Sequence, residues 1–182
     1  MKRFLKPLLI SVGGALILAL IVTSVIFFIP RDNTSFSFEC YRLRLAVSGF
    51  LKDLEKQRYD EAFDRIYPIS EDGTPLECSE RLKEIWVERV SELETSTNTY
   101  LKDFSNLKVV KRNGEFIVTV TLSVIREGYN DPFYAGGSEL SVIYDDGWKI
   151  SSVTKEKEEL QTPFEKALSG RFVSEELNKE AD

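Results

Sequence analysis

The sequence predicts an α+β domain, with about three helices packed on a four-stranded antiparallel sheet, behind an N-terminal transmembrane helix. Three observations predict this arrangement. Apolar residues after position 37 recur first with a period near 3.6, typical of amphipathic helices, and then with a period of 2, typical of strands. Short turn sequences separate the strands, so neighbouring strands are expected to run antiparallel. A long uncharged segment near the N-terminus has the length of a membrane span.

The predicted transmembrane helix covers residues 7–29, a run of 23 residues without a charge. As a helix it would be about 34 Å long, enough for the hydrocarbon core of a bilayer. A cleaved signal peptide would have a shorter apolar region ending at small residues, whereas this run ends at Phe27, Phe28 and Ile29. A retained signal anchor is therefore favoured, followed by a short polar linker over residues 30–37.

Charge is divided unevenly along the chain. Lys2, Arg3 and Lys6 precede the span without any acid, so residues 1–6 are predicted to stay in the cytoplasm and the C-terminal domain to be extracytoplasmic. The 24 basic and 30 acidic residues give a net charge of −6, which leaves −6 − 3 = −9 for residues 31–182. An acidic domain without a basic stripe is not expected to bind nucleic acid. The expected partners are the lipid bilayer of the cell membrane and another membrane or envelope protein.

Three helices are predicted after the linker. One face of the first is apolar and contains Leu43, Val47, Phe50, Leu51 and Leu54. Asp60 is positioned to cap a short second helix over residues 61–67, which Pro68 ends. Ser79 caps the third, whose buried stripe contains Leu82, Ile85, Trp86, Val90 and Leu93.

Four strands are predicted over residues 107–112, 115–126, 138–144 and 148–153. The second strand alternates most clearly, and the apolar residues of one face are Phe116, Val118, Val120, Leu122 and Val124. Asn113-Gly114 suits a two-residue hairpin turn, because both central positions of a type I′ turn need a positive φ.

A polar tail over residues 154–182 follows the last strand. Thr162 and Glu165 form a predicted capping box that opens a short helix over 163–169, and Gly170 suits the end of that helix. A second, weaker helix is predicted over 174–180. The sequence leaves open whether this tail docks on the domain.

The spacing of Tyr59, Ala62 and Phe63, and the hairpin sequence Asp146-Gly147-Trp148 with Ile150, resemble segments of nuclear-transport-factor-2-like domains. In these domains the first helix is followed by a helix with the pattern y-x-x-A-y, and the matching residues here are Tyr59, Ala62 and Phe63. Their curved sheet closes with a D-G-x-W-x-I hairpin, and the matching residues here are Asp146, Gly147, Trp148 and Ile150, without a residue between the glycine and the tryptophan. The resemblance covers about residues 38–153 and implies helices packed on a curved sheet. It selects no function, because the family includes isomerases, dehydratases, protein-binding modules and secretion-system parts.

No catalytic residue or cofactor is predicted. The chain has no histidine, and its two cysteines are too few for a cysteine-rich zinc site. Asp53, Asp60 and Asp64 lie on the helices that would face a family active site, but Asp60 is expected to cap a helix and the other two to be solvated. A general base near neutral pH would need a buried carboxylate with a raised pKa.

The connection Glu127–Gly137 carries three aromatic residues, Tyr129, Phe133 and Tyr134. If they are exposed, these rings are candidates for binding a partner. The alternative is that they fold back and seal the end of the domain. Trp86 and Trp148 are expected in the core, because both fall on apolar stripes.

Cys40 and Cys78 are the only cysteines. Outside the cytoplasm they could form a disulfide that closes a 39-residue loop and adds about 3–4 kcal/mol by loop entropy. The alternative is two small buried thiols.

These observations favour a single-pass, membrane-anchored, extracytoplasmic binding or assembly module without catalysis. The first alternative is a small-ligand-binding domain or carboxylate-based enzyme, which an enclosed polar pocket with a buried Asp or Glu would support. The second is a component of an envelope secretion or conjugation complex. The sequence does not identify the ligand, the partner or the oligomeric state.

Overall fold

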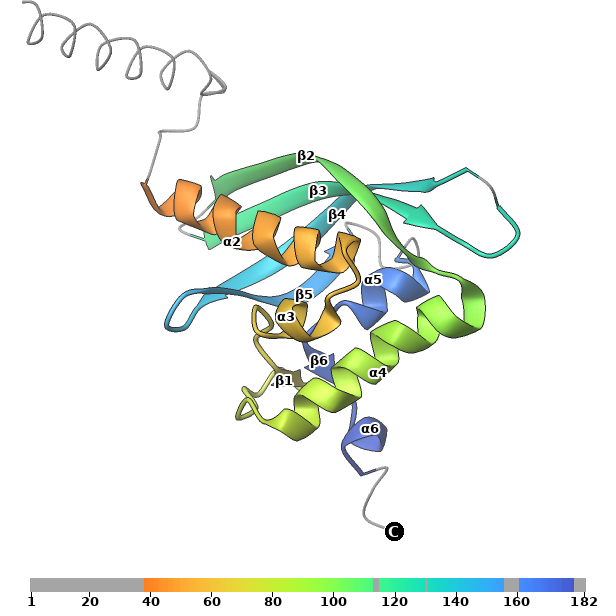
Figure 1. Ribbon diagram of the computed structural model, residues 1–182. Coiled ribbons are helices and arrows are strands. Elements are labelled where there is room, and N and C mark those ends of the chain that lie inside the picture. Colours follow the sequence, from red (N-terminus) through yellow and green to blue (C-terminus); the bar gives the residue numbers. More distant parts are fainter. Residues whose placement is uncertain (1–37, 113–114, 130, 156–160, 179–182) are drawn as a thin grey trace, which may run out of the picture. The chain divides into compact units, whose positions relative to one another are not determined.

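The computed structural model of the protein describes residues 38–112, 115–129, 131–155 and 161–178. The predicted α+β class is confirmed, since several helices accompany a four-stranded antiparallel sheet of order β2-β3-β4-β5 (Figure 1). The predicted cytoplasmic tail, anchor and linker lie outside the described residues, as does the Asn113-Gly114 turn. Among the described residues, no helix combines the length and the apolar character needed to cross a bilayer.

Within the described residues, three helices precede the sheet: α2 (Phe38–Glu55), α3 (Tyr59–Phe63) and α4 (Glu80–Thr97). The apolar face predicted for the first helix is buried in α2. Ser79 caps α4 as expected, with its side chain accepting a hydrogen bond of 3.3 Å from the Leu82 N–H. The capping role predicted for Asp60 is wrong, because α3 begins at Tyr59, two residues before the predicted start at residue 61. Asp60 instead lies in the first turn, where its charge favours the helix N-terminus.

The sheet strands are longer than the predicted ones. Their bounds are β2 (Tyr100–Arg112), β3 (Glu115–Ile125), β4 (Phe133–Tyr144) and β5 (Trp148–Lys155). The first part of β2 escaped prediction because two register shifts interrupt its pairing with β3, and a bulge breaks the alternation of apolar and polar residues.

Bulges on both sides of β3 meet at the same level of the sheet. In β2 the extra residue follows Ser105, and Asn106 there has a φ of 54° and donates a 3.3 Å hydrogen bond to the Thr121 hydroxyl. In β4, Gly136 and Gly137 lie opposite Thr121, and the φ of 71° at Gly137 is one that glycine adopts without strain. Because bulges bend and twist strands, they account for the bend of the sheet around its helices (Figure 1).

One edge of the sheet is covered. The segment after α3 runs beside β5, and the backbones of Arg65 and Tyr67 exchange 2.8 Å hydrogen bonds with Ile150. A bulge at Ser151 then lets Ile150 and Val153, three residues apart, both point into the core. Covering an edge in this way blocks pairing with another chain.

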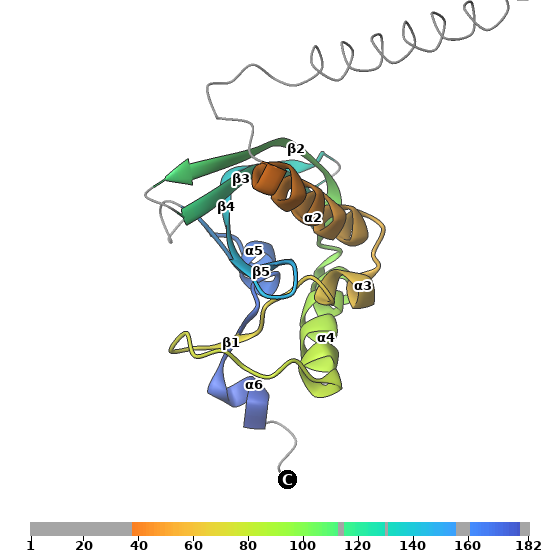
Figure 2. The same cartoon turned by 90° about the vertical axis from the view of Figure 1, so that its left-hand side faces the viewer.

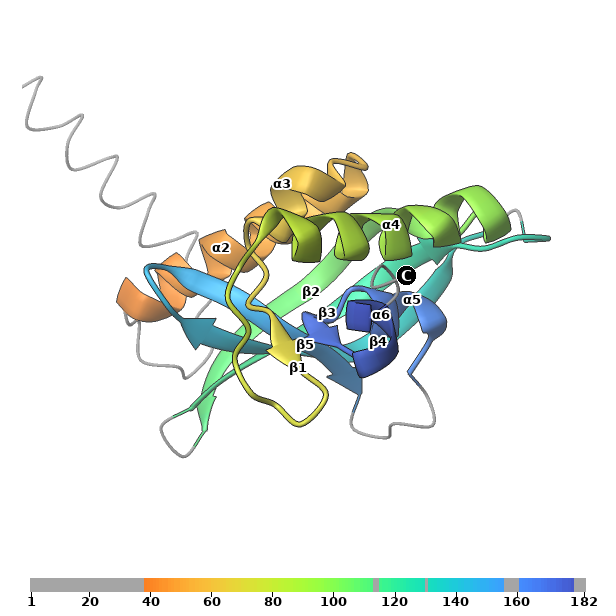
Figure 3. The ribbon, with the colours of Figure 1, turned by 90° about the horizontal axis from the view of Figure 1, so that it is seen from below.

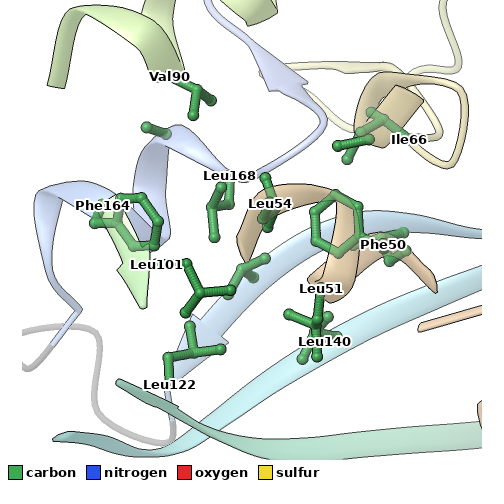
Figure 4. Close-up of a cluster of buried hydrophobic side chains, with 14 of the residues drawn as sticks. Phe50, Leu51, Leu54, Ile66, Val90, Leu101, Leu122, Leu140, Phe164 and Leu168 are labelled. Atoms are coloured by element: carbon green, nitrogen blue, oxygen red, sulfur yellow. The ribbon is translucent and has the colours of Figure 1, made fainter. Parts of the chain in front are cut away.

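The core lies between the inner face of the sheet and the helices. Side chains from α2, α4, the strands and the C-terminal segment meet there, as Figure 4 shows for Phe50, Leu51, Leu122, Leu140 and Phe164, among others. Trp86 is fully buried, as predicted, and contacts the rings of Phe50 and Phe63. Trp148 is only half-buried.

The described part of the polar tail docks on the domain. It forms α5 (Pro163–Ala167), β6 (Arg171–Phe172) and α6 (Ser174–Asn178), and β6 pairs in parallel with β1 (Ile69–Ser70). The views in Figures 2 and 3 place α5 between α4 and the sheet. The core therefore includes four side chains from beyond Val153, namely Phe164, Ala167, Leu168 and Phe172. The predicted capping box of Thr162 and Glu165 is confirmed.

The C-terminal segment is held at Ser169, just after α5. Its carbonyl oxygen accepts hydrogen bonds from the Trp86 indole N–H, at 3.2 Å, and from the Arg89 guanidinium, at 2.5 Å. Arg89 also donates to the carbonyl oxygens of Ala167 and Arg171 and pairs with Glu176 at 3.2 Å. Two side chains of α4 thus satisfy backbone carbonyls that the end of α5 leaves without a helical partner.

Gly170 is needed for space rather than for a helix stop. It does not have the positive φ of a glycine helix cap. Instead, its backbone crosses so close to the segment after α3 that a Cβ atom would lie 2.5 Å from the Tyr67 carbonyl oxygen and 2.8 Å from the Ile66 Cγ2. Only glycine permits this approach without a backbone shift.

We predict that Gly170→Ala lowers the free energy of unfolding by about 1–3 kcal/mol, because the added methyl forces the crossing segments apart. The matched control is Gly136→Ala, where the added Cβ meets no atom within 4 Å and φ is not positive, so a change below about 0.5 kcal/mol is expected. Denaturant unfolding of both variants measures the difference. Equal stability of the two would contradict this role of Gly170.

Candidate functional site

The three predicted partner-binding residues lie at the β3–β4 end of the sheet, where Phe133 and Tyr134, consecutive in β4, point to opposite faces of the sheet. Phe133 and Tyr134 do not belong to a loop, because β4 begins at Phe133 rather than at Ser138 as predicted. Tyr129 lies in the turn between the strands. Tyr129 and Tyr134 are 64% and 66% exposed, and Phe133 is also exposed, so these rings do not seal the domain.

Arg126 joins two of these rings. Its guanidinium carbon lies 5.0 Å from the centre of the Tyr129 ring and 4.2 Å from that of Phe133, within the range of cation–π contact. Its Nε is buried and has no hydrogen-bond partner among the residues that the structure describes. Sequence reasoning missed Arg126, although an arginine just before an aromatic-rich turn was a usable signal. We call Arg126, Tyr129, Phe133 and Tyr134 the aromatic tip.

The aromatic tip has the composition of a protein-binding hot spot. Tyrosine and arginine dominate such sites because they combine large apolar area with hydrogen-bonding groups. The two rings hold the Arg126 guanidinium, which reduces the side-chain entropy lost when a partner binds. A guanidinium recognises a carboxylate through paired hydrogen bonds. The tip can therefore bind a surface that offers an apolar recess and a carboxylate.

A groove of about 1080 Å³ lies on another part of the surface, between α4, the end of β5 and the C-terminal segment. Two largely buried cations line it, and both already have partners: Arg89 pairs with Glu176, and Lys155 with Glu165 at 3.6 Å. Burial lowers the pKa of Arg89, and the charge of Glu176 opposes this shift. These charges hold the C-terminal segment in place, so the groove is a weaker candidate than the tip.

Asp53 is not solvated as the sequence suggested. It is only 4% exposed, and its carboxylate pairs with Arg58 and with the Arg65 Nε, the latter at 3.1 Å. Gly49 makes room for this pair, because a Cβ there would lie 2.8 Å from the Arg65 Cζ. The prediction failed because Arg65 reaches Asp53 only after the chain turns back from α3. Both carboxylate oxygens are engaged, which is the arrangement of a structural residue rather than of a general base.

The other carboxylates of the helices have similar explanations. Asp60 and Asp64 are exposed, and Asp64 lies 3.5 Å from Lys83. Glu165, known from sequence only as a capping residue, is fully buried. Its carboxylate forms the ion pair with Lys155. It also accepts hydrogen bonds from the Thr162 N–H at 2.9 Å, the Thr162 hydroxyl and the Ser138 hydroxyl. Its role is to fasten α5 to the sheet.

The residues that carry the family resemblance in α3 are structural. Ala62 and Phe63 are buried in the core. The Tyr59 hydroxyl donates a 2.7 Å hydrogen bond to Glu94 of α4. Burial, and then this hydrogen bond and the negative charge of Glu94, raise the pKa of Tyr59. These contacts tie α3 to α4.

Cys40 and Cys78 are free thiols in the structure, with Cys40 half-buried in α2 and Cys78 exposed before α4. Their pairing stays a prediction. In the described part of the chain, no three His, Cys, Asp or Glu side chains gather in a way that could hold a metal ion.

We predict that Asp53→Asn lowers the free energy of unfolding by about 1–3 kcal/mol, because a neutral amide replaces the buried acceptor of two guanidinium groups. Asp64→Asn is the matched control, since that carboxylate is exposed and makes a single solvated ion pair, and it should change stability by less than about 0.5 kcal/mol. Chemical denaturation compares them. An unchanged stability of Asp53→Asn would show that its ion pairs contribute nothing.

A scan of the chain against protein-family models finds no match, and no curated protein matches it.

Proposed function

We propose that this protein is a single-pass, membrane-anchored, extracytoplasmic module that binds or assembles with another membrane or envelope protein and does not catalyse a reaction. The observation that carries the proposal is the aromatic tip, where Arg126 lies against the rings of Tyr129 and Phe133, and Tyr134 is exposed on the other face of the same strand end. Aromatic residues and arginine are more frequent at protein–protein interfaces than on the rest of a protein surface.

The anchor is proposed from the sequence. Its 23 uncharged residues favour lipid over water, and the basic residues before them favour an N-terminus in the cytoplasm. A domain confined to the membrane plane meets other envelope proteins at a raised effective concentration. A modest contact area such as the tip is then enough for assembly.

The position of the tip within the domain supports this function. α2 begins at the other end of the sheet, where Glu39 lies 3.9 Å from Lys111 near the end of β2 (Figure 1). The 11 residues of β3 separate the two ends by about 35 Å at the usual rise of a strand. The tip is therefore remote from the point where the chain reaches the domain, and is accessible to a partner.

We also propose that the domain is of the nuclear-transport-factor-2-like kind. Helices that lead into an antiparallel meander, a sheet bent by bulges and buried residues at the y-x-x-A-y positions support this assignment. A non-catalytic role is supported by the carboxylates of the interior, Asp53 and Glu165, which already have partners.

We predict that a photo-crosslinking amino acid at Tyr134 captures a discrete protein partner in the cells that make this chain. The matched control is Tyr144, which lies at the other end of the same strand and is 57% exposed. It should give no such adduct. In the chain labelled at Tyr134, Arg126→Ala should remove most of the crosslinked product, because the guanidinium is the charged centre of the tip. The products are compared by electrophoresis and identified by mass spectrometry.

The proposal is contradicted if Tyr134 and Tyr144 give the same products, or if the Tyr134 adduct persists undiminished in Arg126→Ala. Circular dichroism of Arg126→Ala checks that the variant is folded.

A second experiment tests the predicted topology. In intact cells, a membrane-impermeant maleimide should label Cys78, which is exposed, and Cys78→Ser should lose that labelling. Labelling that requires a reductant would report the predicted disulfide with Cys40. Labelling only after lysis, with reductant present in both samples, would place the domain in the cytoplasm and overturn the proposed localisation.

A further inference from the structure

The outer face of α2 carries an exposed apolar stripe. Phe38, Tyr41 and Leu45 are 69%, 50% and 55% exposed, and their spacing of three and four residues puts them on one side of the helix. The opposite side of the same helix is buried in the core. The first half of α2 is therefore apolar on two faces, one of which has no cover within the described residues. We call Phe38, Tyr41 and Leu45 the outer stripe.

The outer stripe continues onto the sheet. A groove of about 360 Å³ lies between α2 and the bulged part of β2, with Tyr41 and Leu45 on one wall and the half-buried Phe104 and Leu107 on the other. Arg44, Ser48, Ser105 and Asn106 complete its lining. Single exposed apolar side chains are normal on proteins, but a contiguous set marks a surface that meets something other than water.

Aromatic residues gather at the same end of the domain. Trp148 packs edge-on against Phe116 and Tyr144, with ring centres 5.1 Å and 5.3 Å apart, and Tyr144 is exposed. These residues come from the β4–β5 hairpin and the start of β3, and Figure 2 faces the end of the domain where this hairpin and the start of α2 lie. Tryptophan and tyrosine are the residues that concentrate at the headgroup level of membranes.

We propose that the outer stripe lies in the headgroup region of the bilayer that holds the anchor, so that α2 rests on the membrane surface. This inference rests on the anchor of the proposed function. Nine residue steps separate Ile29, the end of the predicted span, from Phe38. At no more than about 3.6 Å per step, the first turn of α2 stays within about 32 Å of the end of the span. The linker is thus short enough to keep the stripe near the bilayer that the proposed anchor spans.

Charge also favours lipid over an acidic protein surface. Arg42 and Arg44 are exposed beside the stripe. With Glu39, which pairs with Lys111, they give residues 38–45 a net charge of +2 − 1 = +1. The chain after the anchor carries −9. Arginines flanking an apolar, aromatic stripe are typical of helices that lie in the plane of the interface and contact lipid phosphates. A second copy of this acidic domain would be repelled more than lipid.

The test uses the full chain in vesicles of phosphatidylcholine with a minor share of phosphatidylglycerol. An environment-sensitive fluorophore is attached to Leu45→Cys, or for comparison to Glu88→Cys on the exposed face of α4, in a chain with Cys40→Ser and Cys78→Ser. At Leu45 the emission should shift to the blue and be quenched by spin-labelled lipid. At Glu88 it should stay unshifted and unquenched. Replacing Phe38 and Tyr41 with serine should reduce the quenching at Leu45.

The outcomes separate this inference from the proposed anchor. If the chain does not float with the vesicles, the anchor is wrong and this inference fails with it. If it floats but the Leu45 label behaves like the Glu88 label, the anchor stands and the docking of α2 is wrong. A blue shift without lipid quenching, or one that grows with the protein-to-lipid ratio, would identify a protein or a second copy as the occupant and overturn the inference.

A further measurement uses the chain without substitutions, so that its result does not depend on whether a variant folds. A photoreactive phosphatidylcholine in the same vesicles should crosslink to the peptide that contains residues 38–45, and not to the exposed residues of α4. Crosslinking spread evenly over both would contradict the docking of α2.

Discussion

The close crossing of the C-terminal segment over α4 and β5, at Ser169 and Gly170, is the contact on which the rest of the domain depends. There the carbonyl oxygen of Ser169 satisfies the buried indole N–H of Trp86 and part of the Arg89 guanidinium, and the bare backbone of Gly170 fits against Tyr67. Without this segment the core would lose Phe164, Leu168 and Phe172, and two donors of α4 would be left unpaired. Since an unpaired buried donor costs about 1–3 kcal/mol, packing and hydrogen bonding here form one cooperative unit.

The buried charged groups likewise have partners on other elements. Among the described residues, Asp53 and Glu165 are the buried carboxylates, and both hold separate elements together: Asp53 pairs with two arginines, and Glu165 with a lysine and two hydroxyls. Two surface features are left for function, the aromatic tip and the outer stripe of α2. They lie at opposite ends of β3, so one can face the membrane while the other faces a partner (Figure 1).

Local signals predicted the elements whose stability is local. The 3.6-residue period marked α2 and α4, the alternation marked β3, and Thr162 with Glu165 marked the start of α5, because each pattern involves side chains a few residues apart. The early part of β2 and the start of β4 were missed, since bulges break the alternation on which strand prediction relies. The three aromatic residues of the tip were found by type, but Arg126 was not, because its stacking on Phe133 depends on how two strands pair.

The sequence by itself determined the α+β class, the faces of the main helices, the acidic charge of the domain and the absence of histidine chemistry. These follow from residue type and short-range spacing, which need no knowledge of distant contacts. Only the tertiary structure decided that the polar tail completes the core, that Gly170 is required for space, that Asp53 is buried between two arginines and that α2 keeps a second apolar face exposed. Each of these depends on residues far apart in the chain, and the geometry that joins them exists only once the sheet and helices have packed.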